Sequence, residues 1–155
     1  MIIWIASYPK SGNTWIRSFL SSYIYTNDGT FNFNLLNKID QFPLLKYYNK
    51  INLYPKNLSE AAQGWVTAQQ VINLDNKIHF MKTHNAMCTI NGNPFTNKEN
   101  SLGAIYIVRD PRDILISYSN FLNMNSYETL TDLTRKNNTS FLNDTVDTKN
   151  IVGSL

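Results

Sequence analysis

Apolar residues along the chain fall into short continuous runs and into stretches with helical spacing. Residues 2–7 form a short apolar run before a Tyr-Pro step, a pattern typical of a buried parallel strand. In residues 14–25 the large apolar side chains recur at helical spacing, and an Asn-Asp-Gly turn follows at residues 27–29. The start of the chain is therefore predicted to be a strand, a loop and a helix.

The middle of the chain is less regular. Residues 31–56 mix aromatic residues with Asn and Pro and keep neither period, so we expect short helices and loops there. Ser59 and Glu60 can cap a helix whose apolar stripe continues to Ile72 and packs in the core. A second strand is predicted at residues 77–83.

The strand-then-helix order recurs further along. Residues 87–102 carry Asn-Gly and Asn-Pro turn signals and are predicted to be a polar connection, followed by a third strand at residues 104–108. Asp110 as the cap and Pro111 as the first helical residue predict a helix that ends near residues 123–125.

Strands that alternate with helices predict the α/β class. We expect a P-loop-like parallel sheet with flanking helices, incomplete at its carboxyl end, in which ligands bind at the carboxyl ends of the strands. One more helix is expected around residues 128–136, and residues 137–155 are weakly patterned. Residues 1–155 are expected to form a single domain without an internal boundary.

Composition narrows the classes of partner. With 155 residues, 43% of them hydrophobic, the chain can bury the core of one domain. Its net charge of +3 is small and dispersed, which argues against a nucleic-acid partner and suits a small anionic ligand. Cys88 is the only cysteine, so we expect no intrachain disulfide and a reducing, cytoplasmic setting. No stretch approaches the roughly 20 apolar residues that span a bilayer, so no membrane span is expected.

The loop after the first predicted strand has the features of a phosphate site. Such a site needs backbone N–H groups at a helix N-terminus, a glycine for a tight turn and a cation. The Walker A pattern of ATPases and GTPases has its Lys directly after a second glycine, whereas here the Lys precedes a single glycine, which disfavours that class. The residues concerned are Lys10, Ser11, Gly12, Asn13 and Thr14.

A longer run around this loop resembles the 5′-phosphosulfate loop of the sulfotransferase family, which often has Thr where this chain has Asn13. The resemblance implies 3′-phosphoadenosine 5′-phosphosulfate (PAPS) as the cofactor. It also implies that Lys10 stabilises the leaving bridging oxygen, that Gly12 to Thr14 bind the 5′-phosphate beside Ser11, and that Trp15 stacks on adenine. The alternative for Trp15 is a core aromatic residue. The matching run is Tyr8-Pro9-Lys10-Ser11-Gly12-Asn13-Thr14-Trp15.

A second segment resembles the family element that holds the 3′-phosphate of the cofactor. Arg109 follows the third predicted strand, where a guanidinium can make a bidentate contact with a phosphate. Ser117 lies two turns into the next helix and would add a hydroxyl group. The alternative is that Arg109 pairs with Asp110 or Asp113 and that Ser117 is a small packing residue.

The third segment, Lys82-Thr83-His84, resembles the Lys-x-His that the family has at a strand end. Residues two apart on a strand share a face, so Lys82 and His84 are expected to project together at the carboxyl edge of the sheet. Histidine is well suited to accept a proton near neutral pH, so His84 is the predicted general base, with Lys10 and Lys82 flanking the transferred group. His79, an odd number of residues away, is interpreted as structural.

These segments predict a PAPS-dependent sulfotransferase that sulfates a hydroxyl or amine of a small-molecule acceptor and releases adenosine 3′,5′-bisphosphate. No cluster of carboxylates suggests a metal. The resemblance covers only the first half or so of a typical member, so the alternative is a truncated or degenerate fragment that binds nucleotide without catalysis. An atypical kinase would need a carboxylate for Mg²⁺, and Asp110 is better used as a helix cap. The acceptor and the oligomeric state are left open.

Overall fold

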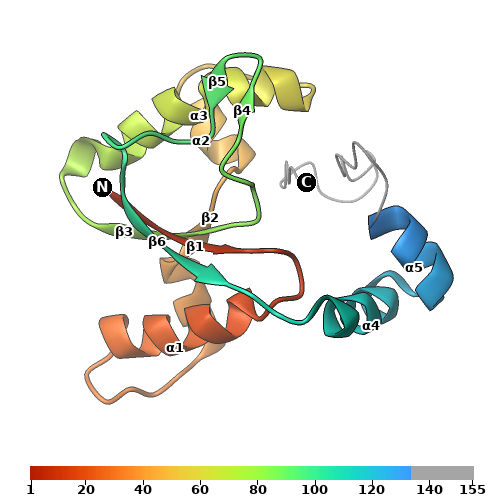
Figure 1. Cartoon of the computed structure of the whole chain (residues 1–155). Helices are drawn as coiled ribbons and strands as arrows, with labels where there is room; N and C mark the ends of the chain where they lie inside the picture. The colour runs from red at the N-terminus through yellow and green to blue at the C-terminus, as the bar shows by residue number, and fades with distance from the viewer. Residues whose placement is uncertain (134–155) are drawn as a thin grey trace.

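The computed structural model describes residues 1–133 and contains a parallel sheet with helices on both faces (Figure 1). The strands of this sheet follow the order β2-β3-β1-β6, and each neighbouring pair is parallel. The predicted α/β class, with a parallel sheet and flanking helices, is therefore confirmed. The four strands are β1 (Ile2–Ser7), β2 (Asp40–Gln41), β3 (His79–Thr83) and β6 (Ser101–Ile107).

The helices divide between the two faces of the sheet (Figure 1). One face carries α1 (Asn13–Tyr25) and the short helix η1 (Phe33–Lys38). The other face carries a layer of helices and a small antiparallel hairpin, and two further helices follow β6 beyond the end of the sheet. These elements are α2 (Leu45–Asn49), α3 (Leu58–Ile72), η2 (Asn73–Asp75), β4 (Thr89–Ile90), β5 (Asn93–Pro94), α4 (Pro111–Leu122) and α5 (Ser126–Leu133).

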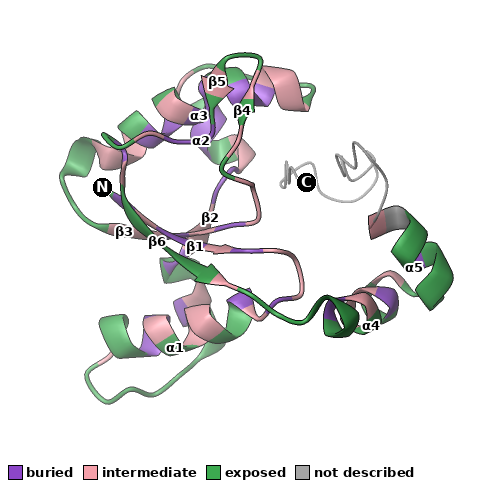
Figure 2. Cartoon of the chain, in the orientation of Figure 1, coloured by how far each residue is buried: buried purple, intermediate pink, exposed green. Residues whose placement is uncertain are grey.

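Aromatic side chains form the core between the sheet and α3. The ring of Phe95 lies 5.2 Å from that of Trp4 on β1 and 5.4 Å from that of Trp65 on α3, measured between centroids. Phe42 contacts both Trp4 and Phe95 and is fully buried. The buried positions of β1 and α3 accordingly line the space between these two elements (Figure 2).

The sequence predicted the capping residue of α4 correctly and that of α3 incorrectly. Asp110 caps α4 as predicted, because its carboxylate accepts a hydrogen bond from the Arg112 backbone N–H at 2.9 Å. The cap of α3 is Asn57 and not Ser59: the Asn57 side chain accepts a bond from the Glu60 N–H at 2.9 Å. The Glu60 carboxylate in turn accepts hydrogen bonds from the Lys56 backbone N–H and the Asn57 side chain. Asn57 and Glu60 therefore cap the helix start reciprocally.

Other boundaries differ where pairing between distant segments decides them. Residues 31–56 contain the short strand β2, which exists because it pairs with β3. β6 begins inside the predicted polar connection, at Ser101, because β1 offers a pairing partner there. The predicted end of the last helix at residue 136 and the stretch 137–155 lie outside the described residues. Within the described part, no helix is both long and apolar enough to cross a bilayer.

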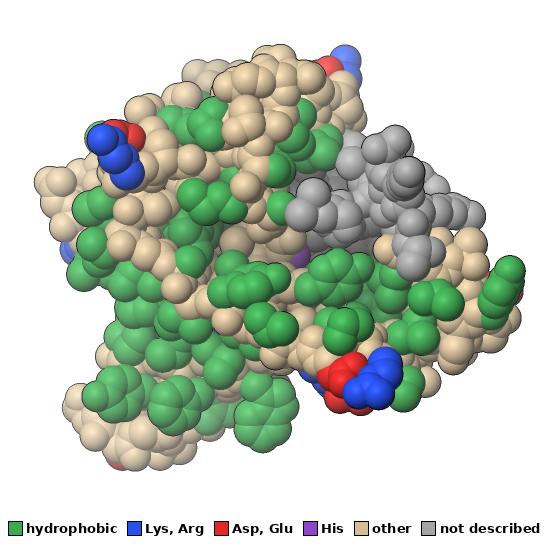
Figure 3. Space-filling model, in the orientation of Figure 1, with side chains coloured by type: hydrophobic (Ala, Val, Ile, Leu, Met, Phe, Trp, Pro, Cys, Tyr) green, Lys and Arg blue, Asp and Glu red, His purple; other side chains and the backbone are tan. Residues whose placement is uncertain are grey.

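Many apolar side chains of α1 and β6 are exposed. Within residues 1–133, β6 is an edge strand that pairs only with β1. Hydrophobic side chains gather over the face that α1 and β6 share (Figure 3). The most exposed of them are Trp15, Phe19, Tyr23, Tyr106 and Val108.

Candidate active site

The loop between β1 and α1 is a tight turn that ends at the helix N-terminus. Two of its residues adopt positive φ angles, Lys10 at 66° and Gly12 at 104°. A positive φ is uncommon outside glycine, and strained backbone of this kind gathers at functional sites. Gly12 precedes α1 without a side-chain cap, so the first N–H groups of a 13-residue helix are left without a side-chain acceptor. This arrangement attracts an anion.

The same loop carries a polar atom that lacks a protein partner. Within the described residues the Ser11 hydroxyl is buried and makes no hydrogen bond, although a buried polar group normally has a partner. The ammonium group of Lys10 lies over the ring of Phe121, 4.4 Å from its centroid. The loop therefore combines an orphaned hydroxyl, a cation and an uncapped helix start, and these residues fit a phosphate or phosphosulfate group.

Arg109 connects the loop to the end of β6. Its Nη1 donates a hydrogen bond to the backbone carbonyl of Lys10 at 3.0 Å. The ion pair with Asp113 is long, 3.9 Å from Nε to the carboxylate, and both side chains are partly exposed. Ser117 lies further along α4 and is half-buried. Arg109 thus contacts the phosphate loop directly and has only a weak carboxylate partner.

Asp110 is occupied by a different arginine. Besides capping α4, its carboxylate accepts hydrogen bonds from the Arg112 side chain, the shortest of them at 2.6 Å from Nη2. Hydrogen bonds from the Arg112 side chain and backbone hold the pKa of this carboxyl below its usual value. Asp110 thus caps α4 and pairs with Arg112, which agrees with its interpretation as a helix cap.

Lys82 and His84 lie at the carboxyl end of β3 and interact electrostatically. Lys82 is half-buried and donates a hydrogen bond from Nζ to the Gln41 side chain at 2.9 Å. Burial, followed by the charge of Arg17, lowers the pKa of Lys82 to about 8. Burial, followed by the charge of Lys82, lowers the pKa of His84 to about 4. His84 is therefore neutral at pH 7, and Lys82 retains its charge.

His84 is tied to the end of β1. Its Nδ1 lies 2.8 Å from the backbone carbonyl oxygen of Ser7 and 3.3 Å from the Ser7 hydroxyl. Ser7 is the last residue of β1 and directly precedes the phosphate loop. The histidine and the loop therefore meet at the same end of the sheet.

His79 occupies the opposite end of β3. It pairs in register with Ile2 at the start of β1, and its Nε2 lies 2.8 Å from the carboxylate of Asp75. The two histidines of the described chain are thus separated by the length of the strand. Only His84 is near the phosphate loop.

Trp15 is not a core residue of the described part of the chain, since 82% of its surface is exposed. Its neighbour Asn13 behaves in the opposite way. The Asn13 side chain is buried and donates hydrogen bonds to the Ile5 carbonyl and the Ser7 hydroxyl. Both hydrogens of the Asn13 amide are thus used within the protein, while its Oδ1 is buried without a partner among the described residues.

Sequence reasoning missed Arg17. Its guanidinium donates hydrogen bonds to the carbonyl groups of Leu36 and Ile39, at 2.8 and 2.6 Å. Its charge lowers the pKa of both Lys82 and His84. The available signal was that Arg17 is the one charged residue in α1, on a helix that leaves the phosphate loop.

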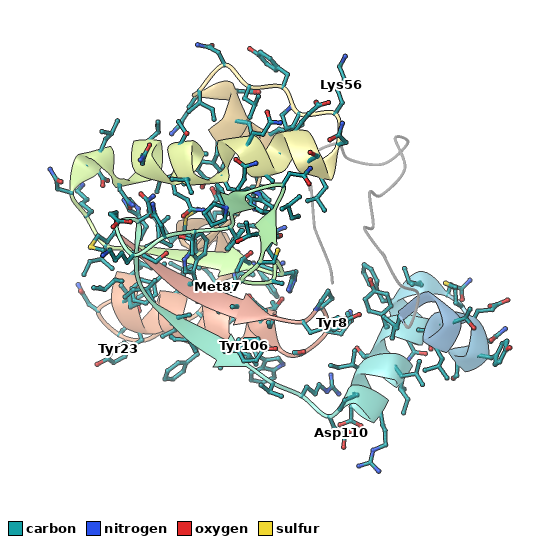
Figure 4. All side chains as sticks on the ribbon, turned by 45° about the horizontal axis from the view of Figure 1, so that its top comes forward. Tyr8, Tyr23, Lys56, Met87, Tyr106 and Asp110 are labelled. Atoms are coloured by element: carbon teal, nitrogen blue, oxygen red, sulfur yellow. The ribbon has the colours of Figure 1, made fainter. Side chains whose placement is uncertain are left out.

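The sequence motifs converge at the carboxyl ends of the parallel strands, where α/β sheets bind ligands. In Figure 4, Tyr8 follows the end of β1 and Asp110 lies where the chain leaves β6 for α4. One pocket at this edge is lined by Ser11 from the loop, by Arg109, and by aliphatic side chains of α4 and α5. The loop and Arg109 can therefore contact a single ligand.

Comparison with known proteins gives one result. The family model described as a sulfotransferase domain matches residues 2–154, nearly the whole chain. No curated protein and no solved structure matches the chain significantly. With a tight loop before the uncapped start of α1, a strand-end arginine and a strand-end histidine at one edge of its sheet, this chain belongs to the sulfotransferase domain family.

Proposed function

We propose that this chain transfers sulfonate from PAPS to a hydroxyl or amine of a small-molecule acceptor and leaves adenosine 3′,5′-bisphosphate as the product. The observation that carries the proposal is the pocket that Ser11 and Arg109 line together. A nucleotide with an anionic group at each end needs two separate anion sites in one pocket, and the Ser11 hydroxyl at the helix start and the Arg109 guanidinium would supply them. PAPS when bound supplies the activated sulfonate.

The loop and the strand end would hold opposite ends of the cofactor. Ser11 and the N–H groups of Gly12, Asn13 and Thr14 would bind the 5′ side, because they lie at the uncapped start of α1. Arg109 and Ser117 would bind the 3′-phosphate. Trp15 is exposed enough to stack on the adenine.

His84 would act as the general base. It is neutral at pH 7 because burial and the charge of Lys82 lower its pKa to about 4. It can therefore take the proton that the acceptor hydroxyl or amine loses as its oxygen or nitrogen attacks sulfur. Lys10 and Lys82 would neutralise the charge that develops on the sulfonate and bridging oxygens.

We also propose that residues 1–155 form one domain and that the protein works in the cytoplasm. The parallel sheet runs without interruption from β2 to β6 in the described part, which supports a single core. The single Cys88 supports a reducing compartment.

The proposed function is tested by equilibrium titration. Adenosine 3′,5′-bisphosphate should bind far more tightly than ATP, because ATP lacks the 3′-phosphate that Arg109 would hold. Arg109→Ala should weaken bisphosphate binding by about 10- to 100-fold, the value of a charge-assisted hydrogen bond, and remove most of the preference over ATP. Lys98→Ala is the control, because Lys98 also carries a positive charge, is 93% exposed and does not line this pocket.

Equal binding of ATP and the bisphosphate would contradict the PAPS assignment. A sulfonate-transfer assay run beside the titration separates the remaining alternative. Tight bisphosphate binding without turnover would indicate a sulfotransferase-like fragment that binds nucleotide and does no chemistry.

The pH dependence of kcat/KM follows from His84 and Lys82. Activity needs a neutral His84, so it should fall as the pH drops through about 4. Activity also needs a charged Lys82, so it should fall as the pH rises through about 8. We expect a bell-shaped profile of kcat/KM, which reports the free enzyme.

Lys82→Arg should remove the alkaline limb, because arginine keeps its charge. An acidic limb near the ordinary histidine pKa of about 6.5 would contradict the buried-base assignment.

A further inference from the structure

We propose that Asn13 and Ser7 are positioning residues for His84: they hold the end of β1 so that the imidazole carries its proton on Nδ1 and leaves Nε2 to accept one. This inference rests on the proposed function only for its catalytic consequence. The tautomer itself is a property of the free protein.

The carbonyl of Ser7 determines which nitrogen of His84 is protonated. His84 Nδ1 lies 2.8 Å from the Ser7 carbonyl oxygen, and a carbonyl can only accept a hydrogen bond. Nδ1 must therefore carry a hydrogen. A neutral imidazole has a single N–H, so the lone pair is on Nε2.

Burial and the charged groups around His84 keep the imidazole neutral at pH 7. Burial is the largest cause of its lowered pKa, followed by the charge of Lys82 from β3, and Arg17 on α1 lowers it further. The hydrogen bond to the Ser7 carbonyl acts in the opposite direction but is weaker than burial. At neutral pH the imidazole is thus in one protonation state, and the carbonyl selects one tautomer of it.

Asn13 holds that carbonyl in place. Its Nδ2 donates one hydrogen bond to the Ile5 carbonyl at 2.9 Å and another to the Ser7 hydroxyl at 3.1 Å. Both hydrogens of the amide are used, and they span the last residues of β1. Asn13 is also the first residue of α1, so its side chain joins the helix start to the strand end.

The Ser7 hydroxyl completes the link. It is buried, it accepts the bond from Asn13, and its oxygen lies 3.3 Å from His84 Nδ1. The hydroxyl and the carbonyl of the same residue therefore both face Nδ1. Fixing the side chain of Ser7 restricts the orientation of its backbone carbonyl.

Asparagine can donate two hydrogen bonds from its side chain, whereas threonine can donate one. The family loop that this chain resembles often has Thr at this position, and a threonine hydroxyl has one hydrogen to donate. It can donate to the Ile5 carbonyl or to the Ser7 hydroxyl, but not to both. Asn13→Thr should consequently weaken the hydrogen bonding between the start of α1 and the end of β1, while a polar side chain still occupies the position.

The tautomer is measured by nitrogen-15 NMR of the histidine side chains in the full chain at neutral pH, without cofactor. The chain has only two histidines, so His79 serves as an internal reference. In the wild type we expect His84 in the Nδ1–H tautomer alone. In Asn13→Ala we expect a mixture of both tautomers, and in Asn13→Thr a smaller change in the same direction. Ser7→Ala should also give a mixture.

Asn73→Ala is the matched control. The Asn73 amide also donates two hydrogen bonds, at 3.1 and 3.0 Å to Asn100, and its Oδ1 is buried without a partner among the described residues, as that of Asn13 is. It caps the C-terminus of α3, and its two hydrogen bonds are made to Asn100, which precedes β6. Its variant should lose comparable stability and keep the His84 tautomer of the wild type.

Turnover gives a second, separate measurement. Asn13→Ala should lower kcat by about 10- to 100-fold, the loss seen when a partner that orients a metal-bound histidine is removed. The affinity for adenosine 3′,5′-bisphosphate is measured on the same variant, so that an effect on cofactor binding is separated from the effect on kcat. Asn13→Thr should restore part of kcat.

Two outcomes would overturn the inference. One is a wild-type His84 in the Nε2–H tautomer, and the other is a folded Asn13→Ala protein with the Nδ1–H tautomer unmixed. Either leaves the proposed function standing. A correct tautomer in a protein that binds the bisphosphate no better than ATP would instead reject the proposed function and keep the positioning role.

Discussion

His84→Ala should lower the rate of single-turnover sulfonate transfer by about 10²- to 10⁴-fold, the usual contribution of a general base. The affinity for adenosine 3′,5′-bisphosphate should stay the same. The imidazole contacts the end of β1 through Nδ1, and it is neutral at pH 7 because its pKa is lowered to about 4. Removing it would take away the proposed proton acceptor and leave Arg109 and the loop in place.

His79→Ala is the control for this experiment. His79 belongs to the same strand, but it pairs with Asp75 at the other end. Its loss should lower the melting temperature and spare the rate of the folded protein. A His84→Ala protein that transfers sulfonate at the wild-type rate would remove the base from the mechanism.

Trp65→Ala should reduce the free energy of unfolding by about 3–5 kcal/mol, the usual cost of removing a large buried aromatic side chain. Trp65 is 1% exposed, and its ring meets that of Phe95 edge to face at 5.4 Å. Phe95 in turn contacts Trp4 on β1, so the cavity would open between α3 and the sheet. Such a loss is a large share of the roughly 5–15 kcal/mol that stabilises a domain.

The unfolding experiment has a matched control in Trp15→Ala. The same substitution on a side chain that is 82% exposed should change stability by no more than about 0.5 kcal/mol. Urea titration gives both values, as shifts of the midpoint at unchanged slope. If the two tryptophan variants unfold at the same urea concentration, the aromatic core between α3 and the sheet is not the main source of stability.

Local signals in the sequence predicted the elements that surround the site. The apolar run of residues 2–7 and the helical spacing that follows it correspond to β1 and α1 within one residue. Asp110 and Pro111 predicted the start of α4, because a cap and a first-turn proline act through bonds within a few residues. The family was recognisable for the same reason, since its loop is one continuous stretch.

Prediction from the sequence was weaker for short elements that form only by pairing with a distant part of the chain. β2 has two residues, and no period in residues 31–56 distinguishes it from a loop. The cap of α3 was placed at Ser59 in place of Asn57, since both are good capping residues and only the course of the chain before the helix decides between them.

The sequence by itself determined the fold class and predicted the site residues, among them the loop after β1, Arg109 and His84. Only the tertiary structure decided how they are linked. The Ser7 carbonyl meets a histidine 77 positions away, and Arg109 reaches the carbonyl of Lys10 across 99 positions. Arg17 became part of the candidate site only through such long-range interactions, its hydrogen bonds to the carbonyl groups of Leu36 and Ile39 and the effect of its charge on Lys82. A backbone carbonyl has no sequence signature, because every residue has one, so a bond to it becomes visible only when the strands are paired.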